Sequence, residues 1–126
     1  MRELRKLEVA TQARSLAIAV YGITALFPVH ERYGLAAQMR RAAISIASNI
    51  AEGSGRGGER EFVRFLYIAL GSATELSIQI DLAIALDLIA AADGASLADH
   101  VNHVQRMLNR FTARVRRKLN QATVET

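Results

Sequence analysis

The sequence of 126 residues contains no cysteine, no tryptophan and only one proline. Without cysteine, the chain has no disulfide framework, no thiol nucleophile and no cysteine-ligated metal site. The lack of disulfides is consistent with a reducing compartment, and we expect a cytoplasmic protein. No stretch approaches about 18 uninterrupted apolar residues, and no basic segment followed by an apolar core opens the chain. The sequence therefore predicts no signal peptide, no membrane-spanning segment and no membrane partner.

The arrangements of side chains that carry catalysis are also missing. Helical bundles that bind paired metal ions use Glu-x-x-His on two helices, and this pattern does not occur here. His100 and His103 are three residues apart, but Asp99 is the only acidic residue near them, which is too few ligands for a typical metal site. No serine has an identifiable base at a suitable spacing. We therefore expect no enzyme activity, no metal and no cofactor.

Apolar residues at helical spacing are abundant. Hydrophobic residues make up 51% of the chain, and they recur at steps of three and four residues, which line one face of an α-helix. Pro28 ends the first such helix, and Asp93-Gly94 forms the turn before the last one. The pattern predicts one domain over residues 1–126, with helices at about residues 4–27, 33–51, 59–91 and 97–119.

The third predicted helix is apolar on two faces. Phe62 and Ile80 belong to one apolar stripe, whereas Tyr67, Ile78 and Leu82 belong to a second. A helix that is apolar on two faces is buried on two sides, and in so short a domain the second side is best used against another subunit. We therefore expect an all-α fold, an antiparallel up-down four-helix bundle that assembles as a homo-oligomer.

Residues 53–58 contain a literal G-x-G-x-x-G. A dinucleotide-binding fingerprint needs a strand before the glycines, whereas a helix that we expect to end near Glu52 precedes them here. The segment is therefore predicted to connect two helices, with a glycine in the left-handed conformation at the helix end. One functional alternative remains, in which Arg56, Arg60 and free backbone N–H groups at the next helix start hold a phosphate.

Three segments carry a longer motif, namely residues 40–53 (RRAAISIASNIAEG), 61–66 (EFVRFL) and 71–76 (GSATEL). Together with Phe27-Pro28 and Tyr33-Gly34-Leu35, they resemble the 23S rRNA-intervening-sequence protein family, whose members are small bacterial four-helix bundles. The resemblance extends over about residues 7–119. Ala47 departs from it, at a position where we expect proline in many relatives.

The resemblance implies that the bundles assemble into a homopentameric ring. For function it implies nucleic-acid binding, an idea that rests on basic surfaces and on where some of the genes lie. It implies no particular reaction.

Basic charge is concentrated near the end of the chain. The net charge is +4, and six basic residues without any acidic one lie between positions 106 and 118: Arg106, Arg110, Arg114, Arg116, Arg117 and Lys118. Cations are favoured near the C-terminal end of a helix, so this run is either a solvated face or a track for phosphate groups. No aromatic residue lies within the basic stripe, and binding of RNA or DNA would therefore be led by the backbone, with little sequence specificity.

Two more arginines, Arg40 and Arg41, lie in the middle of the second predicted helix. We expect them to form structural ion pairs with the third helix, at Glu75 or Asp81. Two functional hypotheses follow for the whole chain. The first is a non-catalytic oligomer that binds nucleic acid, and the second is a scaffold ring that binds a partner protein, with the arginines serving ion pairs between subunits.

Overall fold

The computed structural model of the chain describes residues 2–55 and 57–125. The described residues form four α-helices, one short 3-10 helix and no strand. The elements are α1 (Arg2–Thr24), η1 (Val29–Glu31), α2 (Leu35–Gly55), α3 (Glu59–Ala85) and α4 (Ala91–Glu125). The predicted all-α fold with four helices is confirmed.

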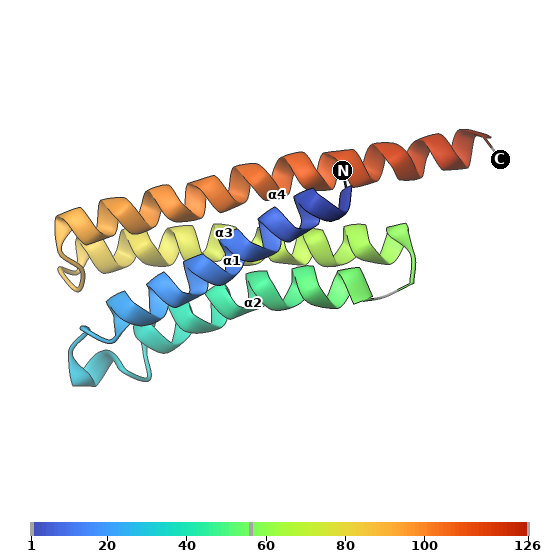
Figure 1. Ribbon diagram of the computed structural model, residues 1–126. Helices are drawn as coiled ribbons and strands as arrows, with labels where there is room; N and C mark the ends of the chain where they lie inside the picture. Colours follow the sequence, from blue (N-terminus) through green and yellow to red (C-terminus); the bar gives the residue numbers. More distant parts are fainter. Residues whose placement is uncertain (1, 56, 126) are drawn as a thin grey trace.

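The helices pack as a bundle in which each one contacts two others. The contacting pairs are α1 with α2, α2 with α3, α3 with α4, and α1 with α4. Figure 1 shows that the connections lie at alternate ends of the bundle and that α4 extends beyond its neighbours at its C-terminal end. Helices α1 and α3 therefore lie at diagonally opposite corners, with the core between all four.

The core consists of the apolar stripes that the helical spacing predicts. The fully buried large side chains include Leu16, Val20, Met39, Ile46, Ile50, Phe62, Leu66, Leu76, Ile80, Leu97, Val101 and Leu108. Near the end of the bundle where α3 begins, the ring of Phe62 meets that of Phe111 edge to face, with centroids 5.7 Å apart. This geometry is favourable for two aromatic rings, and it joins α3 to α4.

Helix α2 continues past the position where the glycines were expected to end it. It runs to Gly55 rather than to Glu52, and Gly53 lies buried within it. A Cβ atom on Gly53 would lie 2.7 Å from Cβ of Phe65 and 2.9 Å from Cδ1 of Phe62. The role of Gly53 is therefore close packing of α2 against α3, and the prediction that it ends the helix was wrong.

The turn between α3 and α4 lies earlier than predicted. Helix α3 ends at Ala85 instead of residue 91, and Asp87 has a φ of 57°, in the left-handed region. The N–H of Leu88 donates to the carbonyl of Ala83 (2.9 Å), and the N–H of Asp87 donates to that of Ile84 (3.1 Å). These two bonds form a Schellman motif, which ends the helix by pairing its last carbonyls.

The predicted turn at Asp93-Gly94 is instead part of the first turn of α4. A Cβ atom on Gly94 would lie 2.6 Å from Cγ1 of Ile84, so this glycine allows α4 to approach the end of α3 closely. The end of α4 differs from the prediction by as much as that of α3, and the bounds of α1 and the start of α2 differ less. Helix α1 ends at Thr24, α2 begins at Leu35, and α4 continues to Glu125.

Helix α3 is long and apolar enough to cross a membrane by length and composition, with a mean hydropathy of 1.3 over 18 residues, 39% of them buried. The sequence prediction missed this property, because it considered only uninterrupted apolar runs. In the bundle, α3 packs against both α2 and α4. The core helix of a bundle needs the same apolar composition.

We predict that Gly53→Ala lowers the free energy of unfolding by about 1–3 kcal/mol, because the new methyl group overpacks the α2–α3 contact. Gly55→Ala is the matched control, since Gly55 is an exposed residue in the last turn of the same helix with nothing within 4 Å of an added Cβ. Urea denaturation at a fixed protein concentration measures both. Equal stability of the two variants would contradict the packing role of Gly53.

Candidate functional site

The six basic residues between positions 106 and 118 all lie on α4, and we call them the α4 basic surface. The opposite side of the helix is buried through Val104, Leu108, Phe111 and Val115. The structure divides the basic residues among three directions, toward α1, toward α3 and into solvent. Arg116, on the α3 side, is therefore separated from Arg110 and Arg114 on the α1 side.

Arg110 and Arg114 lie on the α1 side of α4. With residues of the first turns of α1 they line a hollow of about 330 Å³, here called the α1–α4 cleft. Its lining residues are Leu4, Arg5, Glu8, Val9, Met107, Arg110, Phe111 and Arg114. A third arginine, Arg5, thus joins the two that the sequence analysis had selected.

A second hollow of about 510 Å³ continues along the same two helices. It shares Glu8, Met107 and Arg110 with the α1–α4 cleft and extends past Leu7 to His103. The two hollows therefore form a groove between α1 and α4.

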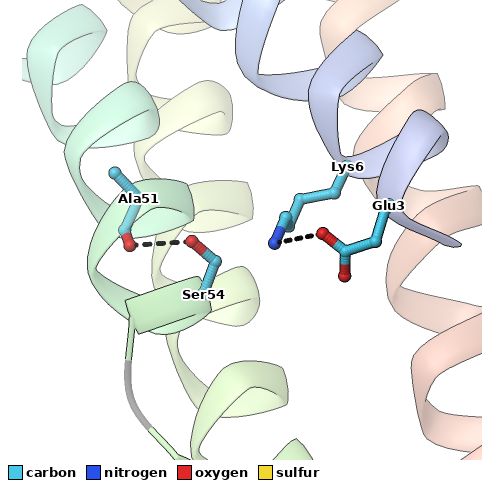
Figure 2. A network of polar contacts seen from close by, with 4 residues as sticks. All are labelled: Glu3, Lys6, Ala51 and Ser54. Atoms are coloured by element: carbon cyan, nitrogen blue, oxygen red, sulfur yellow. Dashed lines mark hydrogen bonds and ion pairs between the residues drawn. The ribbon is translucent and has the colours of Figure 1, made fainter.

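Lys6 is another cation in the first turns of α1, and its charge is partnered. Its Nζ lies 3.0 Å from Oε2 of Glu3. Figure 2 shows this pair between α1 and the end of α2, where the hydroxyl of Ser54 donates to the carbonyl of Ala51 (3.0 Å). Lys6 is absent from the lining of the α1–α4 cleft. Among the described side chains of these turns, Arg5 is therefore the cation that lines the cleft with α4.

Arg116 points toward α3. Its Nη1 donates to the hydroxyl of Tyr67 (2.7 Å), and its guanidinium carbon lies 5.9 Å from the centroid of that ring. Tyr67 is 47% exposed. An exposed aromatic ring thus lies beside the basic surface, although no aromatic residue lies within the stripe in the sequence.

Arg106, Arg117 and Lys118 are exposed. Because an α-helix has 3.6 residues per turn, Arg106 and Arg117 lie about three turns apart on nearly the same outward face. Arg60 is exposed in the first turn of α3. Because Tyr67, two turns further along α3, meets Arg116, Arg60 lies at the same end of the bundle as Arg116. Arg56, the other residue proposed for a phosphate site, lies outside the described residues.

The expected ion pair between Arg40 and Glu75 does not form within the chain. Arg40 instead packs on α1, where its Nε donates to the hydroxyl of Thr24 (2.8 Å), and its guanidinium lies 4.4 Å from the ring centroid of Tyr21. Glu75 accepts a hydrogen bond from Nε2 of Gln79 (3.1 Å). Arg40 lies on the side of α2 that faces α1, which explains why it does not reach α3.

Arg41 is exposed, and in the described part of the chain it makes no ion pair with Glu75 or Asp81. The two neighbouring arginines therefore differ, because only Arg40 is held in a contact between helices. This contrast makes Arg41 a useful control for Arg40.

His100 and His103 lie one turn apart on α4. Burial, and then the neighbouring His103, lowers the pKa of His100 from its usual value of 6.5. No group of three or more histidine and acidic side chains that could hold a metal ion occurs among the described residues.

Two exposed apolar surfaces lie on the diagonally placed helices. On α3 they include Tyr67, Ile78 and Leu82, with Leu86 just after the helix, and on α1 they include Leu4, Leu7 and Ile18. The second apolar face expected for the third helix is therefore largely exposed in the single chain.

A sequence model of the 23S rRNA-intervening sequence protein family matches residues 5–110. The chain belongs to this family. The match ends at Arg110, so the remainder of the α4 basic surface lies beyond it.

A solved structure has the same fold. It is a protein of unknown function from the S23 ribosomal protein family of Bacteroides thetaiotaomicron, with a TM-score of 0.81 and 19% sequence identity. The alignment covers 86% of this chain and 98% of the relative. At that identity the likeness extends to the fold alone. No match was found among curated proteins.

We predict that Arg40→Gln lowers the free energy of unfolding by about 1 kcal/mol, because it removes a hydrogen bond from a charged donor and a contact with an aromatic ring. Arg41→Gln should change it by less than about 0.5 kcal/mol, as expected for an exposed residue. Urea denaturation measures both variants. An effect of Arg40→Gln no larger than that of Arg41→Gln would show that the contact of Arg40 with α1 contributes little to stability.

We also predict that stability falls as the pH drops below 6.5, the usual pKa of histidine. The unfolded chain takes up a proton at His100 more readily than the folded chain, whose pKa is lower, so protonation favours unfolding. The stability that comes with neutral His100 is fully present above pH 6.5. His100→Gln should reduce the loss, whereas His30→Gln, at an exposed position in η1, should leave it unchanged. Thermal denaturation between pH 7.5 and 5 tests this difference.

Proposed function

We propose that the protein is a non-catalytic, cytoplasmic homo-oligomer of antiparallel up-down four-helix bundles that binds the backbone of nucleic acids with little sequence specificity. The observation that carries this proposal is the α4 basic surface. Among the described residues, none of its six cations forms an ion pair with an acidic side chain. Unpaired arginines suit bidentate contact with phosphate groups.

Low sequence specificity follows from the kinds of contact that the surface offers. Contacts to phosphate position a nucleic acid without reading its bases. Tyr67, beside Arg116, adds an exposed ring on which a base of any identity could stack. Several copies of the surface on one oligomer would strengthen binding through multivalency.

The homo-oligomer is supported by the two exposed apolar surfaces. They lie on α1 and α3, at opposite corners of the bundle. Contact between Ile78 and Leu82 on the α3 surface of one subunit and Ile18 on the α1 surface of the next would be heterologous, and heterologous contacts that close form rings. The resemblance to the family implies five subunits in that ring.

The alternative function is a scaffold ring that binds a partner protein, with the arginines forming ion pairs between subunits. Charge distribution supports it, since residues 59–93 carry two basic and six acidic residues, whereas residues 94–126 carry six basic and two acidic. Opposite charges on neighbouring subunits would then account for the arginines that have no partner within the chain.

The test is fluorescence anisotropy of nuclease-treated protein with structured RNA and duplex DNA over a range of salt concentrations. The logarithm of the duplex affinity should fall with that of salt concentration, with a slope of about −0.9 for each phosphate contact. Arg117→Glu should weaken binding roughly tenfold, since it reverses a charge that contacts phosphate. Arg41→Glu makes the same charge change on α2 and should have little effect.

Light scattering of the same variants separates the two functions. Loss of nucleic-acid binding in Arg117→Glu, with the oligomer intact, supports the nucleic-acid-binding function. Dissociation of the oligomer in Arg117→Glu, together with no nucleic-acid binding by the unmodified protein at low salt, would favour the scaffold.

A further inference from the structure

The α1–α4 cleft collects positive charge that the chain does not neutralise. Among the described side chains, three guanidinium groups line it, those of Arg5, Arg110 and Arg114, and Glu8 is the one acidic residue. Arg5 and Arg114 are half-buried. Within the described residues, none of these three side chains donates a hydrogen bond or forms an ion pair. The described lining therefore has a net charge of +2, in a partly enclosed hollow.

The start of α1 adds to this potential. Leu4 and Arg5 belong to the first turn of the helix, where unpaired N–H groups and the macrodipole place partial positive charge. Arg5 has the same sign as this end of the dipole, so it does not stabilise the helix there. A bound anion would relieve the repulsion between Arg5 and the helix end and the repulsion among the three arginines, because its negative charge would neutralise both groups.

The rest of the lining is apolar. Val9 and Phe111 are buried and form part of the wall, whereas Leu4 is 56% exposed and Met107 is half-buried. A small inorganic anion would leave this apolar surface uncovered. The volume of about 330 Å³ is at the lower end of the range for small-molecule sites, about 300–1,000 Å³. An anion that carries a flat, weakly polar group matches both the arginines and the apolar residues of the lining.

We propose that the α1–α4 cleft binds one nucleotide unit, with the phosphate held by Arg5, Arg110 and Arg114 and the base packed against Leu4 and Met107. This inference rests on the proposed function, because it assumes that the nucleotide unit is part of a nucleic-acid strand. The second hollow, which continues past Leu7 to His103, receives the neighbouring unit of the strand. Glu8 lies in both hollows and disfavours a phosphate directly beside it, which places the phosphate toward Arg114.

Methyl NMR of protein labelled at methionine tests the site directly. Met107 lies in the cleft, and Met39 is fully buried in α2 and serves as an internal control. Titration with adenosine 5′-monophosphate at low salt should shift the Met107 signal saturably and leave Met39 unchanged. Inorganic phosphate should compete, whereas adenosine, which has no phosphate, should not saturate the site.

Two pairs of variants show whether the binding depends on the cleft or on general charge. Arg110→Gln and Arg114→Gln should each weaken binding of the monophosphate roughly tenfold, because each removes a charge-assisted hydrogen bond. Arg106→Gln and Arg117→Gln remove the same charge from the exposed face of the same helix. Screening by solvent should limit their effect to about twofold or less. Equal effects of all four variants, or an unchanged Met107 signal, would overturn the proposal.

The same four variants, assayed with a single-stranded oligonucleotide, separate this site from the proposed function. Oligonucleotide binding that weakens equally in all four variants would retain the function and exclude the cleft. Binding of the monophosphate that depends on Arg110 and Arg114, without any oligonucleotide binding, would retain the cleft as a site for free nucleotide and overturn the function. Loss of monophosphate binding in the cleft variants alone, with oligonucleotide binding weakened in all four variants and most in the cleft variants, supports both.

Discussion

Burial of Phe62 between α2 and α4 positions the end of the bundle where the candidate site lies. On one side, its ring and Phe65 occupy the space that a side chain at Gly53 would need. On the other, the ring meets Phe111 edge to face, and Phe111 also lines the α1–α4 cleft. Close approach of α2 to α3 and the position of α4 therefore depend on the same ring, and the lining of the cleft depends on the position of α4.

The arrangement of cations on α4 is a consequence of how one helix packs in a bundle of four. One face of α4 is buried, and its two flanks meet α1 and α3. Basic residues on the α1 flank enter a concave surface with Arg5, and Arg116 on the α3 flank meets Tyr67. Arg106 and Arg117 face solvent, where water and salt screen them. Residues of the same type on one helix thus have different electrostatic environments and different capacities to bind an anion.

Local patterns predicted most of the fold. Apolar residues such as Leu16, Ile46 and Leu108 recur at helical spacing, and they are fully buried in the bundle. The errors lie at helix ends. Asp87 ends α3 in a left-handed conformation, which aspartate adopts only occasionally, so composition did not mark this turn. Gly53 and Gly94 were interpreted as turn residues, but both permit close contact between helices, and that role depends on the partner helix.

By itself, the sequence determined the number of helices, the family and the concentration of basic residues on the last helix, because helical periodicity and local motifs depend on neighbours along the chain. Only the tertiary structure decided which basic residues act together. Arg5 lies at the opposite end of the chain from Arg110 and Arg114, and packing of α1 on α4 brings the three into one cleft. It also placed Arg40 against Thr24 of α1 rather than against Glu75. Contacts between distant segments depend on how the apolar faces of the helices pack, which spacing along a single helix does not specify.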